Sequence, residues 1–187
     1  MRERIPPGQR PISELPVLHV GAVPAFDPAE WDLRVEGLVE APLRLSYQEV
    51  RALPSVALRS DFHCVTSWSR LDNLWEGALV SVVIELARPR PEAAFVTVEC
   101  DGGYSTSLLL AEITGEDVLL AWGLDGKELA PEHGYPLRLV APKKYAYKSG
   151  KWVRRLRLTA QKELGYWEAR GYSDGADPWK EERRAEK

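Results

Sequence analysis

The sequence predicts one domain of the α+β class. Short segments of strand character recur along the chain, and Gly, Pro, Asp or Asn residues bound most of them. Helical patterns are few and short, and they do not alternate regularly with the strands as they would in a βαβ repeat. With 187 residues, 44% of them hydrophobic, the chain can bury one sizeable core.

The first predicted elements follow an arm that is rich in proline. Residues 1–16 carry several prolines and no clear periodicity, which predicts an extended N-terminal arm. Apolar and polar residues alternate over Trp31–Gly37, as in a half-buried strand that ends at a glycine. Ser46 and Glu49 have the spacing of a capping box, which predicts a short helix that stops before Pro54.

The middle of the chain combines strands with one further helix. Residues 56–60 predict a strand, whereas the Ser, Arg, Asp and Asn residues between 66 and 73 predict an ordered polar loop. Apolar residues at helical spacing predict a helix over Glu76–Ala87. Phe95–Cys100 has strand character, and the turn Asp101–Tyr104 starts a second strand.

The last third contains buried strands and a charged end. Asp117–Trp122 is apolar, and Asp125-Gly126 after it is typical of a hairpin turn. Residues 137–140 predict a strand entered through a Gly/Pro turn. Residues 176–187 are dense in charge, which predicts a solvated C-terminal tail and leaves 17–175 as the folded domain.

Composition and charge argue against several classes of protein. The net charge of −3 makes a nucleic-acid partner unexpected. No apolar run reaches membrane-spanning length, and the N-terminal residues lead into no apolar signal core, so we expect no membrane span and a cytoplasmic location. Cys64 and Cys100 are too few for a disulfide framework and form no zinc pattern.

Cys64 lies where the strand that begins near residue 56 is expected to end. A side chain at such a place can face a cleft lined by loops, and a thiolate is the protein group best suited to soft metal centres. The alternative is a structural thiol, because free cysteine is among the most buried residue types. The residues alone leave both interpretations open.

The segment 62–69, Phe-His-Cys-Val-Thr-Ser-Trp-Ser, resembles the molybdenum-binding segment of the sulfite oxidase-type molybdopterin oxidoreductases. The resemblance implies the fold of that family, with mixed β-sheets and short helices. It also implies that Cys64 is the protein ligand to the metal and that Trp68 lines the cofactor and substrate pocket. The C-x-x-x-W-S form is nearer the bacterial sulfoxide-reductase branch than the sulfite oxidases, which have an Asn-Arg-Arg run after the cysteine.

The run from His133 to Arg138, His-Gly-Tyr-Pro-Leu-Arg, is similar to the segment with which this family holds molybdopterin. An arginine offers a planar fork of donors to a phosphate, and a histidine can donate to a phosphate or a pterin oxygen. Taken alone, Arg138 also fits a surface ion pair. Ser149, Gly150 and Lys151 align with the phosphate-contacting loop of the family, although a short basic loop is by default solvated.

Three further residues enter through the resemblance. His19 lies in a stretch that reaches the pterin in the family, with a structural histidine as the alternative. Cys100 aligns with a variable position that is a threonine near the metal in the reductase branch, and a packed thiol is its alternative. Tyr172 matches the tyrosine of a Trp-x-x-x-x-Tyr segment, which implies a hydrogen-bond donor to the substrate; a packing aromatic is the alternative.

The resemblance implies an oxidoreductase that transfers an oxygen atom at a Cys64-ligated molybdenum centre, with molybdenum–molybdopterin as the cofactor. Leu18 and Ser69 stand where sulfite oxidases gather arginines, and Arg70 is displaced along the loop, which favours a neutral sulfoxide or N-oxide over sulfite. The chain has no counterpart of the family's haem domain, so we expect a separate haem or flavin redox protein as the electron partner. A non-catalytic molybdopterin-binding domain or a cofactor-less interaction domain is the alternative.

Overall fold

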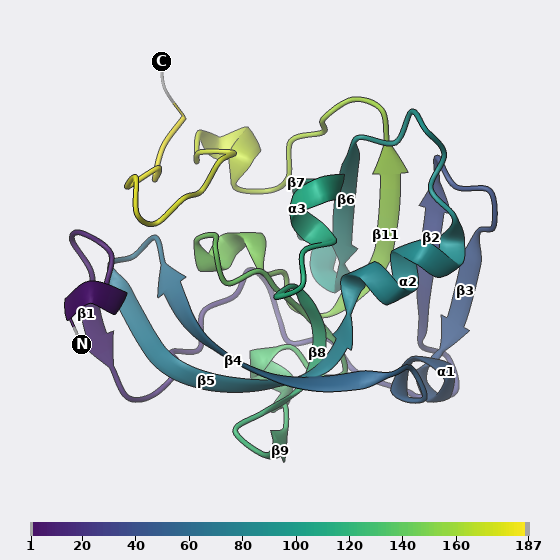
Figure 1. Cartoon of the computed structure of the whole chain (residues 1–187). Helices are drawn as coiled ribbons and strands as arrows, with labels where there is room; N and C mark the ends of the chain where they lie inside the picture. The colour runs from purple at the N-terminus through teal and green to yellow at the C-terminus, as the bar shows by residue number, and fades with distance from the viewer. Residues whose placement is uncertain (1, 186–187) are drawn as a thin grey trace.

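The computed structural model describes residues 2–185, which form two β-sheets joined by short helices (Figure 1). Both sheets are mixed, because each contains one parallel pair among antiparallel neighbours. The predicted α+β class, with mixed sheets and short helices, is confirmed. Met1 of the predicted arm and residues 186–187 of the predicted tail lie outside the described residues.

The larger sheet carries the candidate site at one of its ends. Its strand order is β1-β5-β8-β10, with β4 also paired to β5 and β9 to β8. Its strands are β1 (Arg10–Ile12), β4 (Ser55–Cys64), β5 (Trp68–Leu79), β8 (Leu119–Leu124), β9 (Lys127–Glu128) and β10 (Arg138–Val140). β1 runs parallel to β5, and the turn between β4 and β5 follows directly after Cys64.

The second sheet forms the opposite side of the core. Its order is β3-β2-β11-β6-β7, and β11 runs parallel to β2. Its strands are β2 (Asp32–Gly37), β3 (Leu43–Ser46), β6 (Phe95–Cys100), β7 (Ser105–Leu109) and β11 (Val153–Thr159). The strand predicted over Trp31–Gly37 and the pair of strands around the turn at residues 101–104 are therefore confirmed.

The helices of the described residues are short and act as connections. They are α1 (Tyr47–Arg51), α2 (Val80–Ala87), α3 (Leu110–Ile113) and the 3-10 helices η1 (Arg2–Arg4), η2 (Asp101–Gly103), η3 (Pro131–His133), η4 (Ala146–Lys148) and η5 (Glu168–Arg170). The capping box of α1 is confirmed, because the Ser46 side chain accepts from the Glu49 amide and the Glu49 carboxylate accepts from the Ser46 amide. This bond pattern is local in sequence, which explains why spacing alone predicts it.

Two hydrophobic clusters lie on opposite faces of the larger sheet, because successive side chains of a strand point to opposite sides. Leu120 and Trp122 of β8 belong to the main cluster, which also contains buried residues of α2 and of the second sheet. Leu119 and Ala121 belong to the other cluster, together with Cys64. The remaining buried members of this second cluster are Phe62, Trp68, Trp75, Leu129 and Val140. Cys64 thus sits at the margin of an aromatic-rich packing layer.

The prediction of a polar loop between residues 66 and 73 is wrong, because most of these residues belong to β5. Only Val65–Ser67 form a turn, and β5 begins at Trp68, opposite Cys64. Two fully buried polar side chains in this strand have partners: the Ser69 hydroxyl bonds the His63 ring at 2.8 Å, and the Asn73 amide donates to two backbone carbonyls. Because these hydrogen bonds satisfy them, polar residues are accepted in a buried strand where composition indicated a loop.

The predicted helix over Glu76–Ala87 begins later than expected. Residues 76–79 still belong to β5 and pair with β8, and α2 starts at Val80. A side chain on Gly77 would collide with the backbone of Leu120, so the two strands approach most closely at this point. Residues 76–79 therefore form a strand because they pair with β8, although their apolar spacing predicts a helix.

The charged C-terminal segment is only partly solvated, because some of its residues pack on the domain while others are exposed. Ala176 is fully buried, and its carbonyl accepts from the Tyr145 amide at 2.7 Å. Arg183 donates to the Val65 carbonyl at 2.5 Å and to the Ser67 hydroxyl at 3.1 Å. In Figure 1 this segment lies above the end of the larger sheet where the N-terminal arm also lies. The Arg183 side chain thus binds the turn that follows Cys64.

Candidate active site

A cavity of about 310 Å³ lies at this end of the larger sheet, where segments far apart in the sequence meet. Its walls come from the N-terminal arm, the turn after β4, the connection from η3 through η4, and the segment around η5. The lining residues are Leu15, Pro16, Leu18, His19, Val20, Phe62, Cys64, Val65, Thr66, Trp68, Tyr104, His133, Arg138, Ala146, Tyr147, Ser149, Gly150, Lys151, Trp152, Trp167 and Tyr172. The cavity therefore brings together every predicted site residue except Cys100.

Cys64 ends β4 and lines the cavity with a free thiol. The Thr66 hydroxyl donates to its sulfur at 3.2 Å, and the Gln9 side chain donates to its carbonyl at 3.1 Å. Burial raises the pKa of the Cys64 thiol, so a thiolate at this place needs a cation such as a metal ion beside it.

No group of three or more His, Cys, Asp or Glu side chains in residues 2–185 is placed to hold a metal ion. A metal bound to Cys64 would therefore need ligands from a cofactor. This donor set fits a metal that arrives already chelated, as molybdenum does on the dithiolene of molybdopterin.

Arg138 is a cation without an anion among the described residues. It lies in β10 with 2% of its surface exposed, and its guanidinium donates to the carbonyls of His133 and Ser149. No carboxylate of residues 2–185 pairs with it, and its Nε has no partner. Burial lowers the pKa of Arg138 to about 10. A buried, uncompensated guanidinium of this kind favours binding of an anion.

Lys151 adds a second cation on the same wall. Its ammonium donates to the carbonyls of Leu18 and Glu132 at 2.8 and 2.7 Å, and in the described chain no carboxylate pairs with it. Burial, and then the nearby Arg138, lower the pKa of Lys151 to about 7. His133 stands beside them with a buried Nδ1 that has no hydrogen-bond partner within residues 2–185. Together these three groups offer donors that an anion such as a phosphate could accept, and we call them the anion site.

Sulfate, whose charge is constant near neutral pH, is expected to bind the cofactor-free protein more weakly as the pH rises above about 7. Lys151 loses its proton in this range, and a bound anion favours the protonated form. Calorimetry in two buffers of different ionisation enthalpy should therefore show proton uptake on binding. Lys151→Met should bind more weakly at pH 7 and show no such uptake. Equal pH dependence in both proteins would mean that another group carries it.

Ser149 and Gly150 connect this anion site to the core. The buried Ser149 hydroxyl accepts from the Ala141 amide at 3.0 Å, which leaves its proton free to donate into the cavity. The Gly150 carbonyl accepts from the Leu139 amide at 2.8 Å, so the loop is fixed to β10. Cys100 does not line the cavity, in contrast to its predicted role. Its sulfur packs behind Gly150, and burial raises its pKa far above the ordinary value.

Replacing Gly150 with alanine is expected to destabilise the protein by about 1–3 kcal/mol, the usual cost of overpacking. The added Cβ would lie 2.8 Å from the sulfur of Cys100. Urea unfolding measures the change. In a Cys100→Ala background the sulfur is absent, and the same substitution should cost clearly less. An equal cost in both backgrounds would exclude the close contact as the cause.

Aromatic side chains form the rest of the wall. Tyr172 packs against Trp167 and Tyr147, with ring centroids 5.0 and 5.4 Å apart, and its ring also contacts Arg184. Trp68 is buried, and its indole N–H has no partner among the described residues. These residues give the cavity apolar surface together with the polar tips of a phenol and an indole.

His19 lies at the exposed edge of the cavity. Its Nδ1 is 3.0 Å from the Gly21 carbonyl, and its ring meets Trp152 edge-on at 5.3 Å. It can therefore reach a ligand at the mouth while remaining in contact with solvent.

Sequence reasoning missed several aromatic residues of the wall. Tyr104 and Tyr147 are nearly buried, and the Tyr104 hydroxyl donates to the Tyr147 carbonyl. Tyr147 precedes the phosphate-loop residues by only two positions, so its place in the loop was a usable signal. Tyr104 follows a glycine turn after β6, and nothing in its local sequence distinguishes it from a packing residue.

Comparison with known proteins identifies the family of the chain. Residues 20–167 match the family model for the oxidoreductase molybdopterin binding domain. The chain is 42% identical over 181 residues to the uncharacterized oxidoreductase YuiH of Bacillus subtilis (strain 168), with 96% of this chain and 91% of that protein covered. It is 30% identical over 161 residues to the protein-methionine-sulfoxide reductase catalytic subunit MsrP of Campylobacter jejuni, covering 77% of this chain. The match covers 54% of that relative, so the chain spans about half its length.

Among solved structures, the sulfane dehydrogenase SoxCD from Paracoccus pantotrophus has the same fold, with a TM-score of 0.70 at 24% identity. The likeness covers 76% of this chain and 41% of that one. Family model, relatives and fold agree, and the chain belongs to the oxidoreductase molybdopterin-binding domain family that includes the sulfite oxidases and MsrP.

Proposed function

We propose that this oxidoreductase binds molybdenum–molybdopterin and catalyses oxygen-atom transfer to or from a small substrate. One observation carries the proposal: the Cys64 thiol and the uncompensated cations Arg138 and Lys151 line the same cavity. A thiolate ligand and an anion site are the two features that a metal chelated by a phosphorylated pterin requires.

Each wall of the cavity has its own task in this proposal. Arg138, Lys151 and Ser149 would hold the phosphate, Gly150 would let it approach the backbone, and His133 would donate to the phosphate or the pterin. Cys64 would bind the metal. When bound, the cofactor supplies the two-electron chemistry, and the protein supplies placement and electrostatics. The Tyr172 hydroxyl would donate a hydrogen bond to the substrate oxygen.

The substrate best supported is a neutral sulfoxide or N-oxide. Arg70 is displaced along the chain from the positions where sulfite oxidases gather arginines. Its guanidinium bonds to Asp125 at 2.5 Å and to Asn73, and it does not line the cavity. Leu18, at the matching position in the arm, is apolar. Sulfite would thus lack charge-assisted hydrogen bonds worth about 1.5–3 kcal/mol each from these two positions.

Turnover assays decide between the substrates. Reduction of a sulfoxide takes two electrons and two protons and yields a thioether and water, so a reduced dye can supply the electrons under anaerobic conditions. We expect turnover with methionine sulfoxide or an aliphatic N-oxide, and little oxidation of sulfite with an oxidised dye. High turnover with sulfite and none with sulfoxides would overturn the preference. Tyr172→Phe should lower kcat in the favoured direction while pterin content stays unchanged.

The electrons would come from a separate haem or flavin redox protein. The MsrP relative is described as a catalytic subunit, which supports a division of the reaction between two proteins. We further propose that the enzyme works in the cytoplasm. None of the helices within residues 2–185 has the length and apolarity needed to cross a bilayer.

A further inference from the structure

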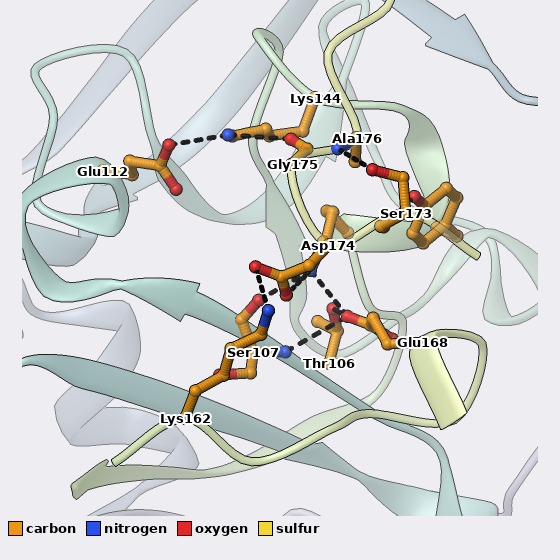
Figure 2. Close-up of polar contacts among 12 residues, drawn as sticks. Thr106, Ser107, Glu112, Lys144, Lys162, Glu168, Ser173, Asp174, Gly175 and Ala176 are labelled. Atoms are coloured by element: carbon orange, nitrogen blue, oxygen red, sulfur yellow. Dashed lines mark hydrogen bonds and ion pairs between the residues drawn. The ribbon is translucent and has the colours of Figure 1, made fainter. Parts of the chain in front are cut away.

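Two opposite charges are buried completely behind the cavity wall. Lys148 and Glu168 each have 1% of their side-chain surface exposed, and the ammonium lies 2.6 Å from the carboxylate. Lys148 also donates to the Ser107 carbonyl at 2.8 Å and to Asp174 at 3.1 Å. The Thr106 hydroxyl donates to Glu168 at 2.7 Å. Figure 2 shows Thr106 and Ser107 of β7 close to Glu168 and Asp174, which come from the C-terminal part of the chain.

The charged pair joins the two segments that carry opposite parts of the site. Lys148 ends η4 and directly precedes the phosphate-loop residues Ser149 and Gly150. Glu168 starts η5, between Trp167 and Tyr172, which line the cavity. Neither Lys148 nor Glu168 lines the cavity itself. The pair therefore links the segment that carries Ser149 and Gly150 to the segment that carries Trp167 and Tyr172.

The backbone around the pair is packed too closely to shift freely. A side chain on Gly165 would place its Cβ 2.5 Å from the Ser105 carbonyl and 2.7 Å from the Glu168 carboxylate. The Tyr166 amide donates to the same Ser105 carbonyl at 2.8 Å. On the other side, the Tyr147 hydroxyl donates to the Ser173 carbonyl at 2.5 Å. Both segments are thus held on β7 and on each other, with the ion pair at the centre.

Stability alone gives no reason for charges at this place. Two buried ions lose their hydration, and apolar residues of similar volume often replace such a pair without loss of stability. A directional pair with several hydrogen bonds does, however, specify one relative position of the segments it joins. We propose that Lys148 and Glu168 are positioning residues that hold the phosphate loop in register with the Tyr172 segment. This inference rests on the proposed function for the identity of the bound group.

The test replaces both charged residues with apolar ones. The melting temperature then reports on the fold, whereas pterin release and kcat report on the site. The double variant Lys148→Met/Glu168→Leu should melt within about 4 °C of the wild type. It should release pterin on the order of tenfold faster and lose kcat by a similar factor, as other outer-shell changes do. The matched control is Lys162→Met, which removes the half-exposed ion pair with Asp174 at 2.6 Å and leaves Lys148 and Glu168 intact. This control should release pterin at the wild-type rate.

Wild-type pterin release and kcat in the double variant would overturn the inference, and so would an equal effect of Lys162→Met. If the double variant does not fold, the single variant Glu168→Gln tests the inference instead. Its amide oxygen can still accept a hydrogen bond from Thr106, whereas the negative charge is removed. Faster pterin release from folded Glu168→Gln supports the positioning role, and an unchanged rate contradicts it. A folded wild type without pterin would refute the proposed function instead. In that case the positioning role is tested by the binding of inorganic phosphate to the cofactor-free wild type and to the cofactor-free double variant. We expect the double variant to bind phosphate about tenfold more weakly.

Discussion

Replacing Cys64 with serine is expected to remove molybdenum from the protein and to lower turnover by at least about 100-fold, since outer-shell changes alone cost 10–100-fold. A hydroxyl is a poor ligand for a soft metal centre, and within residues 2–185 no cluster of other side chains could replace the thiolate. Pterin should remain, because its phosphate would be held by Arg138, Lys151 and Ser149 on another wall of the cavity. Metal analysis and pterin fluorescence after oxidation measure the two parts separately.

Cys100→Ala is the matched control for this experiment. It removes the only other thiol of the chain, which packs behind Gly150 and does not line the cavity. This variant should keep its molybdenum. Retention of molybdenum in Cys64→Ser, or its loss only in Cys100→Ala, would show that the wrong cysteine has been assigned to the metal.

Replacing Arg138 with methionine is expected to lower pterin retention by at least about tenfold, the loss that one charge-assisted hydrogen bond of 1.5 kcal/mol or more produces. Arg138 is the most buried cation of the anion site, and its Nε has no hydrogen-bond partner in the described part of the chain. Methionine has a similar length and can occupy the space between Phe62 and Trp75, whose rings the guanidinium now contacts. Equilibrium dialysis followed by pterin analysis gives the retention.

Two further variants separate charge from geometry at this position. Arg138→Lys keeps the positive charge but loses the planar fork, so it should retain an intermediate amount of pterin. Arg70→Met serves as the control, because Arg70 lies in the same sheet, pairs with Asp125 and does not line the cavity. Wild-type pterin retention in Arg138→Met, or an equal loss in Arg70→Met, would contradict the assignment of Arg138 to the phosphate.

The parts of the fold that the sequence predicts well depend on neighbouring residues. The capping box of α1 involves residues three apart, and the β8–β9 hairpin turn uses the Asp125-Gly126 pair that such turns favour. The candidate site residues were predicted from two short runs, around Cys64 and around Arg138, because these runs resemble segments of a known family. Their residue types alone left structural alternatives open. The structure then adds that both runs line one cavity.

The parts that sequence reasoning missed depend on contacts between distant residues. Ser69 and Asn73 indicated a loop because their hydrogen-bond partners in a buried strand are not visible in the sequence. The Arg183 contact with the Val65 carbonyl joins residues that lie 118 positions apart in the sequence, so composition alone indicated a solvated tail. The Lys148–Glu168 pair was hidden in the same way, because local charge says nothing about burial.

The most direct test of the central claim is the metal and pterin content of the wild-type protein, expressed in a host that makes molybdopterin and purified without chelators. Molybdenum can be measured by mass spectrometry, and pterin by fluorescence after oxidation. The proposed function predicts about one molybdenum and one pterin per chain, since one thiol and one anion site line the cavity. A folded protein that contains neither would contradict the claim and would favour the cofactor-less interaction domain.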